Sequence, residues 1–207
     1  MPFEAYSQAE EIVRKHFYLS SQGKNLSAWI QFPVSNQACR GGVVIASPIS
    51  YEHLHSYRSL RHLADELAKQ GFAVLRFDWH GCGDSAGSDH DSDRLTTWER
   101  NLADAVQWMQ EQAEQTSVTV VGLRMGASIA ALVSRQFPIE NLVLWAPILK
   151  GKSYVREMQA IDLTGEARSQ ELETNVIEAG GFLLNESTAA EIGTIQLQEN
   201  LPGCQEL

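Results

Sequence analysis

The chain has 207 residues, of which 43% are hydrophobic and 20% are charged. It is therefore long enough to bury a sizeable core and has the composition of an ordinary globular protein. The formal net charge of −10 argues against nucleic acid or an anionic membrane surface as a partner, because both repel an acidic protein. The three cysteines (Cys39, Cys82 and Cys204) lack the spacing of a metal site and are expected to be reduced thiols. We expect no metal ion and no other cofactor.

The N-terminal segment, MPFEAYSQAEEIVRKHFYLSS, has no apolar run of the kind that signal peptides carry. No stretch approaches the ~18–20 apolar residues that a membrane span needs. The sequence therefore predicts a cytoplasmic location.

Strands and helices alternate along the chain. Apolar, β-branched runs predict buried strands at residues 41–47, 72–78, 117–121 and 141–146. Amphipathic or small-residue stretches predict helices over residues 57–70, from Thr96 to 109 behind a capping box, and from 126 to about 137. Residues 14–20 and 26–32 flank the turn-prone SQGKN and predict an antiparallel hairpin. This order predicts an α/β fold with a mostly parallel sheet, helices on both faces and ligand-binding loops at the carboxyl ends of the strands.

Two motifs in this order resemble those of the α/β-hydrolases, specifically the serine aminopeptidase and lysophospholipase group. FDWHGCGDSAG (77–87) is similar to the D-x-x-G-x-G-x-S-x-G loop of that group, and its wording is closest to hydrolases associated with exosortase gene clusters. VVGLRMGAS (120–128) is similar to the nucleophile elbow, G-x-S-x-G. The resemblance covers residues 17 to 147 and implies a three-layer α/β-hydrolase-like fold.

The chain departs from this group where the chemistry is expected. Arginine, Arg124, stands at the serine position of the elbow, and a guanidinium has no accessible lone pair with which to attack a carbonyl. Relatives often begin the oxyanion loop with His-Gly, whereas this chain has Ser47-Pro48-Ile49. The acid and histidine of the triad would follow two further strands, which we expect the sheet to lack. We expect a core at 1–147 and a helical, lid-like segment at 148–207, broken at Gly180-Gly181.

The predicted binding residues surround the elbow. Arg124 would lie at a helix N-terminus, where free N–H groups and the helix dipole favour an anion. The backbone N–H groups of Ile49 and Met125 would form an oxyanion-type pocket, with Ser47 beside it. The partner of Arg124 would be a small anionic or acyl-type ligand, or a protein carboxylate such as Asp78 or Asp84. A passive replacement at position 124 is the alternative.

Other side chains are less favoured for chemistry. Ser47 is the best-placed displaced nucleophile, although the sequence gives it no evident histidine partner. Ser128, Ser85 and Cys82 are expected to be structural. A metal interpretation of His53 and His55, predicted on a loop, with His62 and Glu52 is disfavoured because the ligand spacing does not support it. Trp79 and Trp145 are expected in the core or a pocket wall.

Two functions remain open. The first is a non-catalytic binding or interaction protein, a pseudo-enzyme on a hydrolase scaffold. The second is an ester, thioester or peptide hydrolase, or an acyl transferase, with a displaced nucleophile or completed by a second chain. The apolar strand at 141–146 would lie at the edge of the sheet and invites pairing with another chain, so we also expect a homodimer through this edge.

Overall fold

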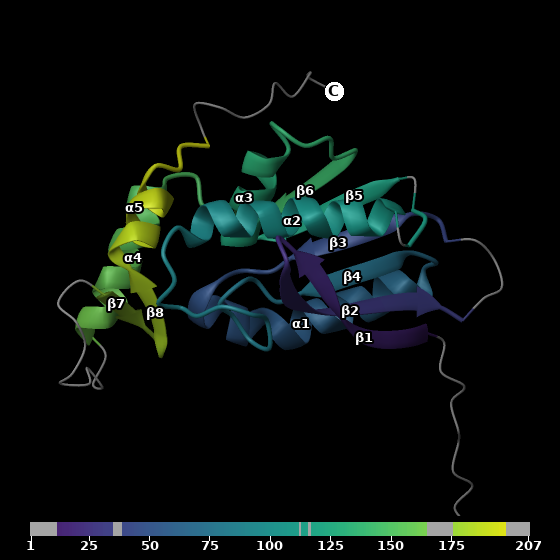
Figure 1. The fold of residues 1–207 in the computed structure, drawn as a ribbon, viewed down its shortest axis with the longest axis horizontal. Helices are drawn as coiled ribbons and strands as arrows, with labels where there is room; N and C mark the ends of the chain where they lie inside the picture. Colours follow the sequence, from purple (N-terminus) through teal and green to yellow (C-terminus); the bar gives the residue numbers. More distant parts are fainter. Residues whose placement is uncertain (1–11, 35–38, 112, 116, 165–175, 198–207) are drawn as a thin grey trace, which may run out of the picture.

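The computed structural model describes residues 12–34, 39–111, 113–115, 117–164 and 176–197. Six strands form the main sheet in the order β1-β2-β4-β3-β5-β6 (Figure 1). Pairing is antiparallel between β1, β2 and β4 and parallel from β4 to β6. The predicted mostly parallel sheet is thus confirmed. Its strands are β1 (Ile12–Ser21), β2 (Lys24–Pro33), β3 (Gly42–Ala46), β4 (Ala73–Phe77), β5 (Val118–Leu123) and β6 (Asn141–Trp145).

The N-terminal hairpin forms where the turn-prone segment predicts it. Ser21 pairs with Lys24, so the connecting loop has two residues, Gln22 and Gly23. Both have positive φ, 50° and 73°, as the type I′ hairpin turn requires. The hairpin extends the sheet on the side away from the elbow.

Helices cover both faces of the sheet (Figure 1). On one face α1 (Ser50–Lys69) packs on β1, β3 and β4. On the other, α2 (Arg94–Glu111) and α3 (Met125–Val133) bury a larger apolar core. The sheet and these helices form the three layers expected of the resemblance. Among the described helices none is long and apolar enough to cross a membrane.

Two helices begin earlier than their sequence patterns indicate. α1 begins at Ser50, so His53 and His55 lie in its first turns, and their prediction as loop residues is wrong. The start was missed because Ile49, the N-cap, makes no side-chain capping hydrogen bond. α2 begins at Arg94, and the hydroxyl of Thr96 donates to Glu191 of a distant helix (2.7 Å). The predicted capping box at Thr96 therefore does not open this helix.

The segment after β6 contains a hairpin as well as helices. α4 (Gly151–Thr164) is followed by β7 (Val176–Ala179), β8 (Phe182–Asn185) and α5 (Glu186–Gly193), and we call these four elements the lid. Gly180 and Gly181, with φ of 60° and 82°, form a two-residue turn between β7 and β8. The prediction that this stretch is helical is wrong here, whereas the short helix near Ser187 is confirmed.

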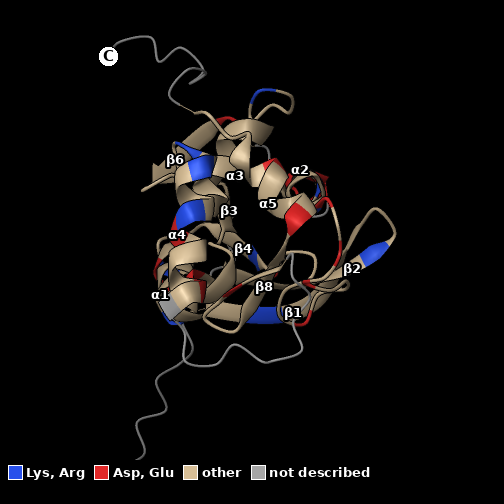
Figure 2. Cartoon of the chain, turned by 90° about the vertical axis from the view of Figure 1, so that its left-hand side faces the viewer, with Lys and Arg blue, Asp and Glu red and all other residues tan. Residues whose placement is uncertain are grey.

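The lid covers the carboxyl ends of the parallel strands (Figures 1 and 2). Ser50, just after β3, donates to the Ala179 carbonyl of the lid (3.4 Å). Asp93, in the loop after β4, accepts a hydrogen bond from Ser187 (2.7 Å). Buried lid side chains belong to the main core cluster, among them Tyr154, Met158, Leu184 and Ile192. The lid is therefore packed onto the core at the edge where ligands bind in such sheets.

β6 is an edge strand among the described residues and pairs only with β5. Its side chains alternate in exposure. Leu142 and Leu144 pack toward the core, whereas Val143 and Trp145 are 49% and 57% exposed. The prediction that Trp145 lies in the core or a pocket wall is wrong, because α1 covers β1, β3 and β4 but leaves this part of the sheet open.

Candidate functional site

The backbone at position 124 has the form of a nucleophile elbow. Arg124 links β5 to α3 with φ 54° and ψ −119°, which is a strained backbone conformation for any residue other than glycine. A Cβ at Gly126 would collide with the carbonyl oxygens of Ala46 and Ser47, and one at Gly122 with the Ala127 backbone. The two glycines of the G-x-S-x-G pattern thus have their steric roles here, with arginine at the apex.

Arg124 is paired with protein carboxylates. Its Nε donates to Glu52 Oε1 of α1 (2.6 Å), and Nη2 lies 3.5 Å from Glu157 Oε2 of α4. Tyr154 of α4 donates to the second Glu52 oxygen (3.4 Å). Burial lowers the pKa of the guanidinium, but the hydrogen bond and charge of Glu52 outweigh it, so the pKa of Arg124 is raised. The arginine joins the core to the lid through two acidic residues.

Asp78 and Asp84, the carboxylates suggested for Arg124, do not pair with it. Asp78 accepts from the backbone N–H of Asp84 (3.3 Å) and therefore holds the loop after β4. Its other oxygen lies 3.7 Å from His53 Nε2. The sequence missed Glu52 and Glu157 as the partners because both lie far from position 124 in the chain.

Ser47 has a histidine partner after all. A hydrogen bond of 3.1 Å joins Ser47 Oγ to His53 Nδ1, and His53 Nε2 faces Asp78, giving the order serine, histidine, aspartate. The expectation that no histidine accompanies Ser47 is wrong, because it placed His53 on a loop instead of in the first turn of α1. A helix beginning at Ser50 would have brought the pair together.

The surroundings of this chain of contacts are closed. Ser47 is 6% exposed, and the adjoining cavity measures about 20 Å³, which is room for about one water molecule. Burial lowers the pKa of His53 despite the charge of Asp78, so the imidazole is neutral at pH 7. Burial likewise raises the pKa of Asp78. The three side chains tie the start of α1 to the ends of β3 and β4.

The remaining candidate nucleophiles have structural roles. Ser128 is fully buried, and its hydroxyl bonds to the Ile148 backbone. Ser85 Oγ donates to the Asp78 carbonyl (2.6 Å) and accepts from the Ser27 N–H. Burial raises the pKa of the Cys82 thiol to about 11, so it is protonated at pH 7 and a poor nucleophile.

Ile49 and Met125, the residues predicted for an oxyanion-type pocket, each lie at the start of a helix. Ile49 is the N-cap of α1 and Met125 the first residue of α3, and both side chains are buried. The close approach of Gly126 to the end of β3 brings the two helix starts together. Among the described residues, no group of three His, Cys, Asp or Glu side chains could hold a metal ion.

A second, larger cavity lies under the lid. It measures about 200 Å³ and is lined by Ile49 and Ser50 of the core, Tyr154 and Met158 of α4, and the β7–β8 hairpin. Its charged groups are Asp89, in the loop after β4, and Arg94, the first residue of α2. Arg124 is not among the residues that line it, and its guanidinium is paired with Glu52 and Glu157.

The sheet order, the two-sided helical cover and the elbow define an α/β-hydrolase-fold protein. The chain belongs to the serine aminopeptidase S33 family, whose family model matches residues 42–177. No curated protein matches the sequence.

Solved structures agree on the fold. Est1E from Butyrivibrio proteoclasticus, solved with ferulic acid, has a TM-score of 0.59 at 19% identity, over 88% of this chain and 72% of its own. A hypothetical protein from Pseudomonas aeruginosa has a TM-score of 0.65 at 14% identity, over 95% and 74%. An esterase from Pyrococcus furiosus has a TM-score of 0.56 at 20% identity, over 74% of this chain and only 55% of its own. These similarities extend to the fold alone.

Proposed function

We propose that the chain is a non-catalytic member of its family that binds a small anionic or acyl-type ligand under the lid. One observation carries the loss of catalysis: the elbow position holds Arg124, whose guanidinium is bound to Glu52 at 2.6 Å. A side chain that is always protonated and already paired cannot form an acyl intermediate. Glu157 and Tyr154 of the lid gather at the same point, so the position that opens to substrate in an active hydrolase is used here to hold the lid. A cytoplasmic location remains a prediction.

Activity-based labelling tests the loss of catalysis. We expect no covalent labelling by a fluorophosphonate probe and no p-nitrophenyl ester hydrolysis above background. Arg124→Ser should not restore either signal, because the new hydroxyl faces carboxylates instead of an imidazole and triad members act as a unit. Stoichiometric labelling of the native protein, mapped to any serine by mass spectrometry, would contradict the proposal.

A displaced nucleophile is the second candidate, and the contacts of Ser47, His53 and Asp78 favour it. In that mechanism Ser47 Oγ attacks the carbonyl carbon while His53 Nδ1 takes its proton, with Nε2–H facing Asp78. The bond to the leaving group then breaks, the leaving group takes the proton from His53, and water hydrolyses the acyl-serine. The small cavity beside Ser47 argues against it, since an ester does not fit without opening. Labelling that disappears in Ser47→Ala but persists in Ser85→Ala would establish this candidate.

We further propose that two copies pair through β6. Its outer edge is unpaired among the described residues, and neither charge nor proline interrupts NLVLW. The opposite edge strand, β1, carries Arg14 and Lys15, which discourage pairing. A two-fold axis would let one self-complementary patch serve both copies.

Light scattering over a dilution series measures this association. We expect a dimer that Val143→Lys converts to a monomer, because the new charge lies on the exposed face of β6. Val13→Lys, at a similarly exposed position of β1, is the matched control and should leave the dimer intact. A native protein that is monomeric at all concentrations rules the dimer out.

A further inference from the structure

The cavity under the lid has a mainly apolar wall with few charged groups. Its described lining includes two charged side chains, those of Arg94 and Asp89, and Asp89 lies 4.0 Å from His90 Nε2. The apolar part of the wall comes from the core and from the lid, and includes Trp98, Met158, Phe182 and Leu184. Sites for small organic ligands have this character, with an apolar body and a few placed polar groups.

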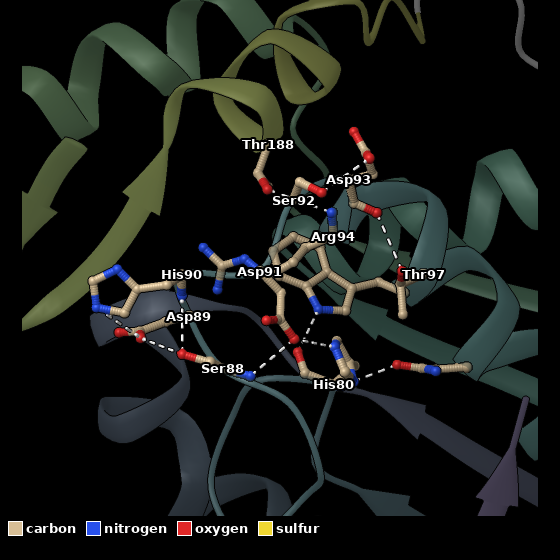
Figure 3. A network of polar contacts seen from close by, with 12 residues as sticks. His80, Ser88, Asp89, His90, Asp91, Ser92, Asp93, Arg94, Thr97 and Thr188 are labelled. Carbon is tan, nitrogen blue, oxygen red and sulfur yellow. Dashed lines mark hydrogen bonds and ion pairs between the residues drawn. The ribbon is translucent and has the colours of Figure 1, made fainter. Parts of the chain in front are cut away.

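Arg94 is held in this wall by contacts that leave part of its guanidinium without a partner. The residue is 3% exposed. Its Nη2 donates to the Leu183 carbonyl (2.7 Å), and its Cζ lies 5.2 Å from the centre of the Trp98 ring. Its Nε is buried and has no hydrogen-bond partner among the described residues. Figure 3 shows Arg94 between the loop that carries Asp89 and Asp91 and Thr188 of the lid.

Among the described residues no carboxylate forms an ion pair with Arg94, in contrast to Arg124. Burial lowers the pKa of Arg94, and the more distant charges of Asp89 and Asp91 oppose this only in part. An uncompensated buried charge is costly, and arginine remains protonated at pH 7. Arg94 is therefore a buried cation at the wall of a mainly apolar cavity, and its Nε has no partner among the described residues.

We propose that the cavity binds a small carboxylic acid with an apolar body, and that Arg94 binds its carboxylate. This inference rests on the proposed binding function and names its ligand class. A planar guanidinium suits a carboxylate because two N–H groups can meet two oxygens. An apolar cavity of about 150 Å³ holds benzene, so about 200 Å³ admits a benzoate-sized acid.

The ligand should carry a single negative charge. Asp89 lines the same cavity. Its carboxylate accepts a hydrogen bond from the Ser88 hydroxyl (3.4 Å) and lies 4.0 Å from His90 Nε2. Its carboxylate would repel a dianion such as phosphate more strongly than a monoanion. The charge of Arg94 attracts the acid, and that of Asp89 limits which acids are accepted.

Calorimetric titration of the native protein with benzoate, and with the neutral and similarly shaped benzamide, tests the proposal. We expect benzoate to bind at least about tenfold more tightly than benzamide, as a charge-assisted hydrogen bond implies. Arg94→Met should lose about that factor for benzoate and little for benzamide. Asp89→Asn should bind benzoate several-fold more tightly, and Arg124→Ala, whose side chain is outside the cavity lining, should keep the native ratio of benzoate to benzamide affinity.

Several outcomes would overturn the proposal: equal affinity for benzoate and benzamide, full benzoate affinity in Arg94→Met, or phosphate binding as tight as benzoate binding. A loss of the preference for benzoate over benzamide in Arg124→Ala, but not in Arg94→Met, would show that the anion binds at the elbow instead. If Arg94→Met does not fold, the benzoate-to-benzamide ratio and the Asp89→Asn result still decide. The fluorophosphonate labelling experiment tests the loss of catalysis independently of benzoate binding. Failure of the carboxylate site can therefore be distinguished from failure of the non-catalytic proposal.

Discussion

Gly151→Ala is expected to lower the melting temperature by roughly 6–12 °C and to loosen the lid. Gly151 begins α4, and its N–H donates to the Ile195 carbonyl (2.9 Å). A Cβ there would collide with the carbonyl oxygen of Ile192, the buried residue near the end of α5. Rigid overlap of this kind costs about 3 kcal/mol or somewhat more, and in a chain of this size each kcal/mol shifts the midpoint by roughly 2–4 °C.

The matched control lies in the same part of the lid. A Cβ at Gly193, the last residue of α5, meets only the flexible Lys152 side chain, at 3.9 Å. Gly193→Ala should therefore change the melting temperature little, measured by circular dichroism alongside limited proteolysis of the lid. If both variants shifted equally, the close approach of α4 to α5 would not be what fixes the lid.

The sheet could be predicted from the sequence because each strand carries its own signal. Buried parallel strands such as β3 and β5 are continuous β-branched runs, and the elbow is marked by Gly122 and Gly126 at a strand–helix junction. Local patterns of this kind need no knowledge of distant contacts. The positions of the strands, and the arginine at the elbow apex, are therefore evident from the order of residues alone.

The two strands of the lid were not predicted, because the local spacing of apolar residues was misleading. Leu172, Val176 and Ile177 have a spacing that suits a helix face, yet Val176 and Ile177 lie in β7, and Leu172 lies outside the described residues. Gly180-Gly181 between two short apolar runs is a hairpin signal, and giving it more weight than the helical spacing would have identified β7 and β8.

The chemistry of the two arginines depends on contacts that no local pattern encodes. Glu52 is 72 positions from Arg124 in the chain, and the start of α1 that places it has no side-chain cap. Arg94 lies outside the helix predicted to begin at Thr96, so nothing indicated that it is buried. Arg124 precedes α3 and Arg94 opens α2. Only the packing around them shows that Arg124 is paired with carboxylates and that Arg94 has an unpartnered Nε.

Glu52→Gln is expected to lower the free energy of unfolding by about 1–3 kcal/mol, measured by urea denaturation. It leaves Arg124 with Glu157 at 3.5 Å as its ion-pair partner and weakens the acceptor of the Tyr154 hydroxyl. Losing one partner of a buried pair costs about 3–5 kcal/mol, and an exposed pair contributes about 0–1 kcal/mol. The Arg124 and Glu52 side chains are 30% and 14% exposed, which places the expected loss between those limits.

A double-mutant cycle that combines Glu52→Gln with Arg124→Ser measures the coupling free energy between the two side chains. If the arginine is held at the strained elbow by Glu52, the double variant should be more stable than the sum of the single losses predicts, by about 1–2 kcal/mol. Glu157→Gln, whose carboxylate is farther from Arg124 and more exposed (48%), is the matched control and should couple to Arg124→Ser by less than about 0.5 kcal/mol. Strictly additive losses in the Glu52 cycle would mean that the short contact contributes nothing. The guanidinium would then be a passive replacement for the serine, and the elbow would not be what joins the lid to the core.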